Sequence, residues 1–199
     1  MVSEDEEGKV TIANIVASGK LNVELDLASV AEDLKDQPGI ESIEHSRRQG
    51  NRLLVRFDEI DTLGIIAPTG VYVFTGADSR REIHKAKKII LSGLSNLGII
   101  SDPDPSDEEI IDSFEIQNFV FTGTLERDLN LNALAIGLGL EHTEYEPEQF
   151  PGLVYRPLSG SCTLLIFASG KVVITGVTSE KIAREELANL NEEIETLLD

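Results

Sequence analysis

Short apolar runs separated by turn residues dominate the hydrophobic pattern of this chain, and they occur in two similar series. A run rich in β-forming residues opens each series, at residues 10–17 and again at 114–121. Runs of this composition are typical of strands. Apolar residues three and four positions apart follow at residues 25–34 and 129–138, which predicts a short helix with one buried face in each series.

Further apolar runs and one longer helix complete each series. The runs lie at residues 52–57, 63–67, 70–75, 152–156, 163–167 and 172–175. Turns that contain Gly70 and Gly170 interrupt them, which favours an antiparallel meander. Helical periodicity at about residues 79–97 and 179–198 closes the two series. Each series therefore predicts a strand, a short helix, several antiparallel strands and a long helix.

The two series are copies of one unit. The segment IANIVASGKL returns as IQNFVFTGTL, with Asn14 shifted by 104 positions to Asn118. Later positions return with a shift of 100, as Arg56 does at Arg156. The first copy thus holds four extra residues between its short helix and its later strands. On this register Phe150 stands opposite Gly50, and Phe167 stands opposite Ala67.

We expect an α+β fold of two pseudo-symmetric repeats, one at residues 10–99, which is degenerate, and one at 114–199. An acidic connector at 100–113 joins them. In each repeat the long helix should cover one apolar face of the sheet and leave the other face free. A free sheet face that carries few charges predicts a binding surface.

Composition narrows the function. The chain has 36 acidic and 17 basic residues, a formal net charge of −19, which by itself argues against nucleic acid at ordinary salt. It favours a protein partner or a salt-rich cytoplasm. No long apolar segment and no signal peptide stand out, so we expect a cytoplasmic protein without a membrane span. No catalytic constellation or metal cluster is recognisable, and we expect neither an enzyme nor a cofactor.

The second copy carries a longer signature. The segment YEPEQFPGLVYR, followed by LLIFASGKVVITG and preceded by Ile116-Gln-Asn118, resembles the TATA-binding protein family of archaea and eukaryotes. The acidity is similar to that of its halophilic archaeal members. The resemblance implies a saddle with a curved antiparallel sheet that binds the minor groove of A·T-rich promoter DNA and bends it.

The resemblance also implies site residues. Asn14 and Asn118 would donate to bases at the centre, while Phe150 and Phe167 would wedge open one terminal base step. Further base contacts are implied for Val16, Ile65, Val73, Thr75, Val120, Leu165, Val173 and Thr175, and phosphate contacts for Arg56, Arg156 and Lys171. Glu146, Glu148 and Gln149 match the loop that holds transcription factor B, and through it RNA polymerase.

Departures from the family pattern lie almost entirely in the first copy. Gly50 and Ala67 offer no wedge, and Val71 stands where the second copy has Lys171. We therefore expect DNA to bend mainly at one end. The alternative is a regulatory relative that binds transcription factor B without holding promoter DNA productively.

Blander interpretations also apply to the aromatic and amide candidates. Phenylalanines in strands usually pack in a core. Asparagines often satisfy local backbone groups.

Overall fold

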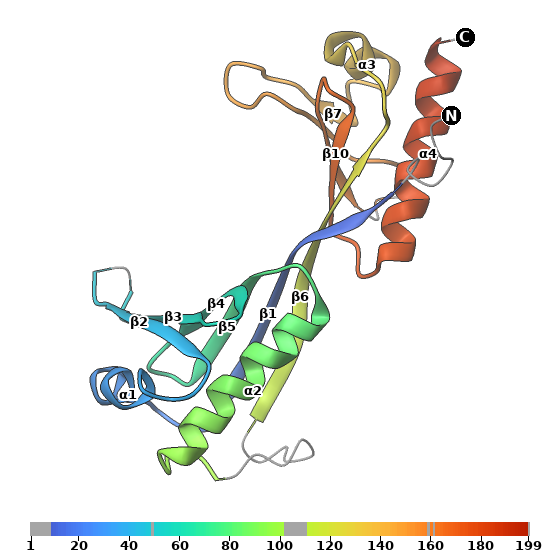
Figure 1. Cartoon of the computed structure of the whole chain (residues 1–199). Coiled ribbons are helices and arrows are strands. Elements are labelled where there is room, and N and C mark those ends of the chain that lie inside the picture. Colours follow the sequence, from blue (N-terminus) through green and yellow to red (C-terminus); the bar gives the residue numbers. More distant parts are fainter. Residues whose placement is uncertain (1–8, 49, 102–110, 159, 161, 199) are drawn as a thin grey trace. The chain divides into compact units, whose positions relative to one another are not determined.

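The computed structural model describes residues 9–48, 50–101, 111–158, 160 and 162–198. Within these residues the chain forms ten strands and four helices, an α+β fold as predicted (Figure 1). It divides into two compact units. The first unit is Asn14–Gln117, and the second unit is Met1–Ala13 together with Asn118–Asp199. Strands β1 and β6 run from one unit into the other.

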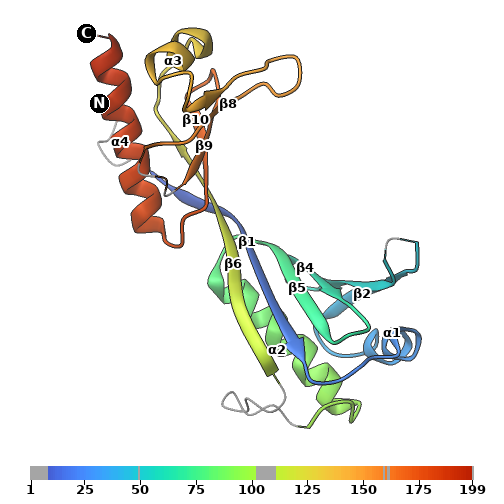
Figure 2. The same ribbon diagram turned by 180° about the vertical axis from the view of Figure 1, so that it is seen from behind.

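The first unit is an antiparallel sheet with two helices. Its elements are β1 (Thr11–Leu21), α1 (Leu27–Leu34), β2 (Ile40–Ser46), β3 (Arg52–Phe57), β4 (Ile60–Ile66), β5 (Val71–Ala77), α2 (Arg80–Asn96) and the beginning of β6 (Ile111–Thr124). The strand order is β2-β3-β4-β5-β1-β6. Helix α2 lies along one face of this sheet, against β4 and β5 (Figures 1 and 2).

Local capping explains where these helices begin. Helix α1 starts after Asp26, whose carboxylate accepts a hydrogen bond from the Ala28 amide at 3.1 Å. Helix α2 starts after Ser79, whose hydroxyl accepts from the amide of Glu82. The Glu82 carboxylate accepts from the Asp78 amide, so the spacing of a capping box is present without its reciprocal bond.

The second unit repeats the same plan. Its elements after β6 are α3 (Leu131–Gly137), β7 (Thr143–Glu144), β8 (Leu153–Tyr155), β9 (Thr163–Ile166), β10 (Lys171–Thr175) and α4 (Glu180–Leu198). The strand order is β6-β10-β9-β8-β7. One face of α4 is buried, with Ala183, Leu187, Leu190 and Ile194 at most 2% exposed.

Strand register shows how closely the two units correspond. One row of paired residues crosses the first sheet at Ser18, Val73, Ile65, Leu54 and Glu44. The row across the second sheet is Thr122, Val173, Leu165, Val154 and Glu144. The two rows therefore match the sequence repeat. Thr122 is shifted by 104 from Ser18, and the other four residues are shifted by 100 from their counterparts. The extra residues of the first unit lie between α1 and β2.

Three elements differ from the sequence prediction. Strands β2 and β7 were not predicted, because β2 is largely polar and β7 has two residues. Strand β6 begins at Ile111, inside the segment 100–113 that was predicted as a connector; most of that segment lies outside the described residues.

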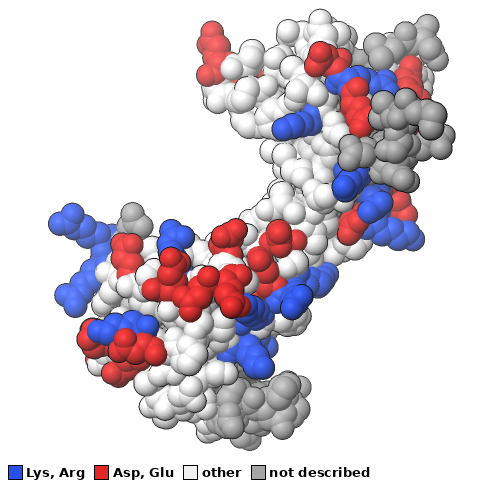
Figure 3. Space-filling view, in the orientation of Figure 1, with Lys and Arg blue, Asp and Glu red and all other residues white. Residues whose placement is uncertain are grey.

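Charge is unevenly spread over the first unit. Lys and Arg side chains gather at the outer end of β2 and β3, as Figure 3 shows. In the described ranges no helix is both long enough and apolar enough to cross a membrane.

Candidate nucleic-acid interface

One face of the first sheet lies away from α2 and carries side chains that are half-exposed. Strand alternation produces this face, because Leu53 and Val55 are fully buried while the residues between and after them point outward. The sequence-predicted contacts on it are half-buried at Asn14, Val16, Ile65, Val73 and Thr75. Strand β3 is next to the edge strand β2 and contributes the exposed Arg56.

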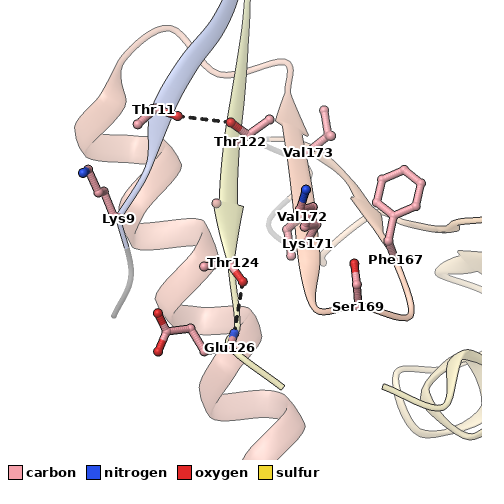
Figure 4. A pocket seen from close by; sticks show the side chains of 11 residues that line it. Lys9, Thr11, Thr122, Thr124, Glu126, Phe167, Ser169, Lys171, Val172 and Val173 are labelled. Atoms are coloured by element: carbon pink, nitrogen blue, oxygen red, sulfur yellow. Dashed lines mark hydrogen bonds between the residues drawn. The ribbon is translucent and has the colours of Figure 1, made fainter. Parts of the chain in front are cut away.

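The second sheet presents the equivalent face. The predicted residues Asn118, Val120, Leu165, Val173 and Thr175 are half-buried, like their counterparts. Part of this face is hollowed into a depression of about 630 Å³. Figure 4 shows Phe167 and Lys171 at this depression, and its lining also includes Val173. Each unit thus brings its predicted base-contacting residues, none of which is charged, onto one sheet face, and Lys9, Glu126 and Lys171 also line the depression in the second unit.

Both asparagines use their side-chain oxygens within the protein. The Oδ1 atom of Asn14 accepts from the amide of Gly76 at 2.7 Å, and its Nδ2 approaches Thr75 Oγ1 at 3.5 Å. The Oδ1 atom of Asn118 accepts from the hydroxyl of Thr175 at 3.3 Å. Local hydrogen bonds therefore use both amide oxygens. An NH₂ group has two N–H donors, so Asn14 keeps one N–H for a ligand beside its long bond to Thr75, and the Asn118 NH₂ group can also donate.

Phe150 and Phe167 form an aromatic pair at one edge of the second sheet. Their ring centroids are 5.8 Å apart and the rings meet at 67°, an edge-to-face arrangement. Both side chains are half-exposed and neither belongs to the buried core. Two apolar rings at the rim of this sheet face can enter a gap between stacked bases.

The first unit has the same hydrogen-bonded turn at the position of Phe167, but without a phenylalanine. The amide of Ala67 donates to the carbonyl of Val71 at 2.8 Å, as that of Phe167 donates to Lys171 at 2.9 Å. The amide of Gly70 likewise donates to Ala67. Because the turns are equivalent, Ala67 occupies the position of Phe167 in the repeat.

Two residues at this edge were missed by the sequence prediction. Gly152 lies under both phenylalanine rings, because a Cβ atom there would be 2.8 Å from Phe150 Cε1 and 3.1 Å from Phe167 Cε1. Its counterpart in the first unit is Arg52, and a Cβ atom on Gly50 would be 2.7 Å from the Arg52 Nη2 atom. The repeat register would have pointed to both, since a glycine stands opposite an arginine.

The predicted phosphate-binding side chains differ in their surroundings. Lys171 and Arg56 are exposed, and neither forms an ion pair with another described residue. Arg156 is exposed but donates from Nη1 to the Glu144 Oε1 atom at 2.9 Å. A guanidinium has further N–H groups, so this ion pair leaves donors for a phosphate.

The predicted partner loop lies between β7 and β8. The carbonyl of Glu146 accepts hydrogen bonds from the amides of Gln149 and Phe150, both at 2.9 Å. The side chain of Gln149 donates to the Glu146 carboxylate. Glu146, Glu148 and Gln149 are all exposed. The loop is a compact turn with two exposed glutamate side chains.

A family model, curated relatives and a solved structure all match this chain over most of its length, and all of them are TATA-binding proteins. A family model described as "Transcription factor TFIID (or TATA-binding protein, TBP)" matches residues 9–97 and 113–197. TATA-box-binding protein C of Halobacterium salinarum is 40% identical over 189 residues, covering 95% of this chain and 99% of that protein. The TATA-box-binding protein of Natronomonas pharaonis is 42% identical over 194 residues, covering 98% and 97%. The solved structure titled "Methanococcus jannaschii TBP" has a TM-score of 0.74 and 36% identity, covering 94% of this chain and 99% of that one.

Proposed function

This chain belongs to the TATA-binding protein family, and on that premise we propose that it binds A·T-rich promoter DNA in the minor groove, bends it and initiates transcription. The observation that carries the proposal is the pair of equivalent sheet faces. Each has an amide donor and a set of small apolar or hydroxyl side chains at register-matched positions. Such side chains suit the base edges on the floor of the DNA minor groove better than they suit a charged ligand.

The chemistry of the minor groove supports this choice. A·T pairs present only acceptors there, whereas a G·C pair adds the protruding amino group of guanine. The NH₂ groups of Asn14 and Asn118 are suited to those acceptors, because their amide oxygens are already used. Val16, Val73, Val120 and Val173 can lie against A·T pairs and would clash with a guanine amino group.

The aromatic pair supplies the bend. Minor-groove proteins, the TATA-binding proteins among them, insert apolar side chains between base pairs and offset the loss of stacking with wider contact. Phe150 and Phe167 would do this at one terminal step. Gly50 and Ala67 cannot do so at the other end, and the bend should be concentrated where the second unit binds.

The remaining predicted contacts complete the promoter complex. Arg56, Arg156 and Lys171 would hold phosphates, which position the protein without reading sequence. Glu146, Glu148 and Gln149 would bind transcription factor B, and RNA polymerase would follow through that factor. In this scheme the protein acts in the cytoplasm.

Binding assays in concentrated KCl test the proposal. Fluorescence anisotropy should show tighter binding to an A·T-rich duplex than to a G·C duplex of equal length. Phe167→Ala should weaken binding, whereas Phe114→Ala should not, because Phe114 stacks on Tyr72 in the first unit and is not on the proposed face. Equal binding to both duplexes, or an unchanged Phe167→Ala variant, would contradict the proposal.

A regulatory function is the second candidate, and the missing phenylalanines of the first unit favour it. Such a protein would bind transcription factor B through Glu146 and Glu148 without holding a promoter. Copurification with transcription factor B together with blank promoter footprints would select this candidate. A ternary complex on promoter DNA would exclude it.

A further inference from the structure

Three arginines lie where β2 of the first unit leads into β3: Arg47 and Arg48 follow β2, and Arg52 is the first residue of β3. All three are exposed. Figure 3 shows the basic side chains that gather at this end of the unit. In a chain with a net charge of −19, a local cluster of one positive sign stands against the overall composition. We call these three residues the arginine turn.

Carboxylates within the described part of the chain do not neutralise the arginine turn. None of its three guanidinium groups forms an ion pair with another described residue. In the second unit the equivalent turn instead carries the exposed Glu146 and Glu148. The repeat therefore has opposite charges at corresponding turns, and the two turns should bind ligands of opposite charge.

Backbone geometry directs Arg52 to the edge of the proposed DNA face. Gly50 and Asn51 both have positive φ, +92° and +48°, and they lead directly into β3. Arg52 alternates with the buried Leu53, so it shares the outward face of β3 with Arg56. Its Nη2 atom lies close over Gly50, the position that Phe150 holds in the second unit. The guanidinium of Arg52 thus lies near the position that corresponds to the Phe150 ring of the second unit.

We propose that the arginine turn binds DNA phosphates at the end of the site that lacks phenylalanines. This inference rests on the proposed function. A guanidinium is a planar fork that matches two phosphate oxygens and stays charged at all relevant pH values. The first unit would then hold its end of the duplex by electrostatic contacts instead of by insertion. Continuity with Arg56 on the same face favours DNA over an acidic protein as the ligand.

The salt dependence of DNA binding tests the arginine turn. Affinity for an A·T-rich duplex is measured by anisotropy over a series of KCl concentrations, for the full chain and for Arg47→Gln/Arg48→Gln/Arg52→Gln. Each lost phosphate contact should make the slope of log K against log [KCl] less negative by about 0.9, or up to about 2.7 in total. Arg48→Gln alone should change it by about 0.9.

A matched variant controls for net charge. Arg81→Gln/Lys85→Gln/Lys88→Gln removes the same charge from α2, which packs on the other face of the sheet, and should leave the slope close to that of the unmodified chain. If the arginine-turn variant keeps the unmodified slope while both proteins bind DNA, the inference is wrong and the proposed function stands. If the unmodified chain binds no DNA, both fail. Loss of binding to poly-glutamate with unchanged DNA binding would assign the turn to an acidic protein and overturn the inference.

Discussion

The ring of Phe150 meets the ring of Phe167 at 67°, with centroids 5.8 Å apart, and Gly152 lies against both. The two phenylalanines come from different turns, one before β8 and one after β9. Their contact therefore depends on a position that has no side chain. The geometry of the proposed wedge is set by three residues rather than two.

Gly152→Ala should disturb this pair. The new Cβ atom would be 2.8 Å from Phe150 Cε1, so at least one ring must move. We expect DNA bending, followed by energy transfer between dyes at the duplex ends, to fall several-fold in amplitude. In a double-mutant cycle, Gly152→Ala should have little further effect once Phe150→Ala is present. Additive losses would show that the glycine acts independently of the rings.

A phenylalanine placed in the first unit should increase bending. Ala67 has the backbone hydrogen bonds of Phe167 and is half-exposed, so Ala67→Phe can present a ring at the second end of the site. The energy-transfer assay should report a larger bend. Thr69→Phe, at an exposed position of the same turn, is the matched control and should change nothing. A similar increase from both variants would indicate nonspecific apolar contact.

The ion pair between Arg156 and Glu144 should restrain DNA binding slightly. Glu144→Gln frees the guanidinium for phosphate and should tighten binding two- to threefold more than Glu44→Gln does. Glu44 is the register equivalent, and its substitution corrects for the loss of one negative charge. Because the pair is exposed, the free energy of unfolding should change by less than about 1 kcal/mol. Equal effects of the two substitutions would mean that the ion pair is irrelevant.

Two buried tyrosines should make the protein sensitive to alkali. Burial raises the pKa of Tyr72 to about 12, above the ordinary value of 10.0. Burial and the hydrogen bond to Glu193 also raise the pKa of Tyr155. The unfolded chain loses these protons first, so the tyrosines' contribution to the unfolding free energy should be fully present below about pH 10 and should decrease as the pH rises from there toward the folded-state pKa of Tyr72, about 12. Denaturant titrations across this range measure the effect.

Substitution of the two tyrosines by phenylalanine should change the free energy of unfolding in opposite directions. The Tyr72 hydroxyl is buried without a hydrogen-bond partner among the described residues, so Tyr72→Phe should stabilise the protein by about 1 kcal/mol at neutral pH. The Tyr155 hydroxyl donates to Glu193 at 2.8 Å, so Tyr155→Phe should destabilise it by about 1 kcal/mol. Destabilisation by Tyr72→Phe would refute the assignment of an unsatisfied hydroxyl.

Much of the fold could be predicted because its signals are local. Strand β3 was predicted with its observed bounds, since alternation and flanking turns define it. The equivalence of Asn14 and Asn118 followed from the repeat. Strand β2 could not be predicted, because it lies at the edge of the sheet beside β3 and its residues are mostly polar. Such a strand is specified by its partner and not by its own pattern.

Contacts that depend on how the strands pair could not be predicted from the sequence. The ion pair of Arg156 with Glu144 requires β7 to pair with β8, and β7 has only two residues. The contact of Gly152 with the Phe167 ring joins segments separated by strands β8 and β9. Likewise, the closeness of Arg52 to Gly50 depends on a turn with two residues at positive φ. The roles of these residues in DNA binding remain predictions.

A crystal structure of the chain bound to an A·T-rich duplex is the most direct test of a one-ended wedge. We predict that Phe150 and Phe167 lie between the base pairs of one terminal step, while the step beside Gly50 and Ala67 stays stacked with Arg52 near a phosphate. Insertion at both ends, at neither end, or binding of DNA away from the helix-free sheet faces would contradict this account.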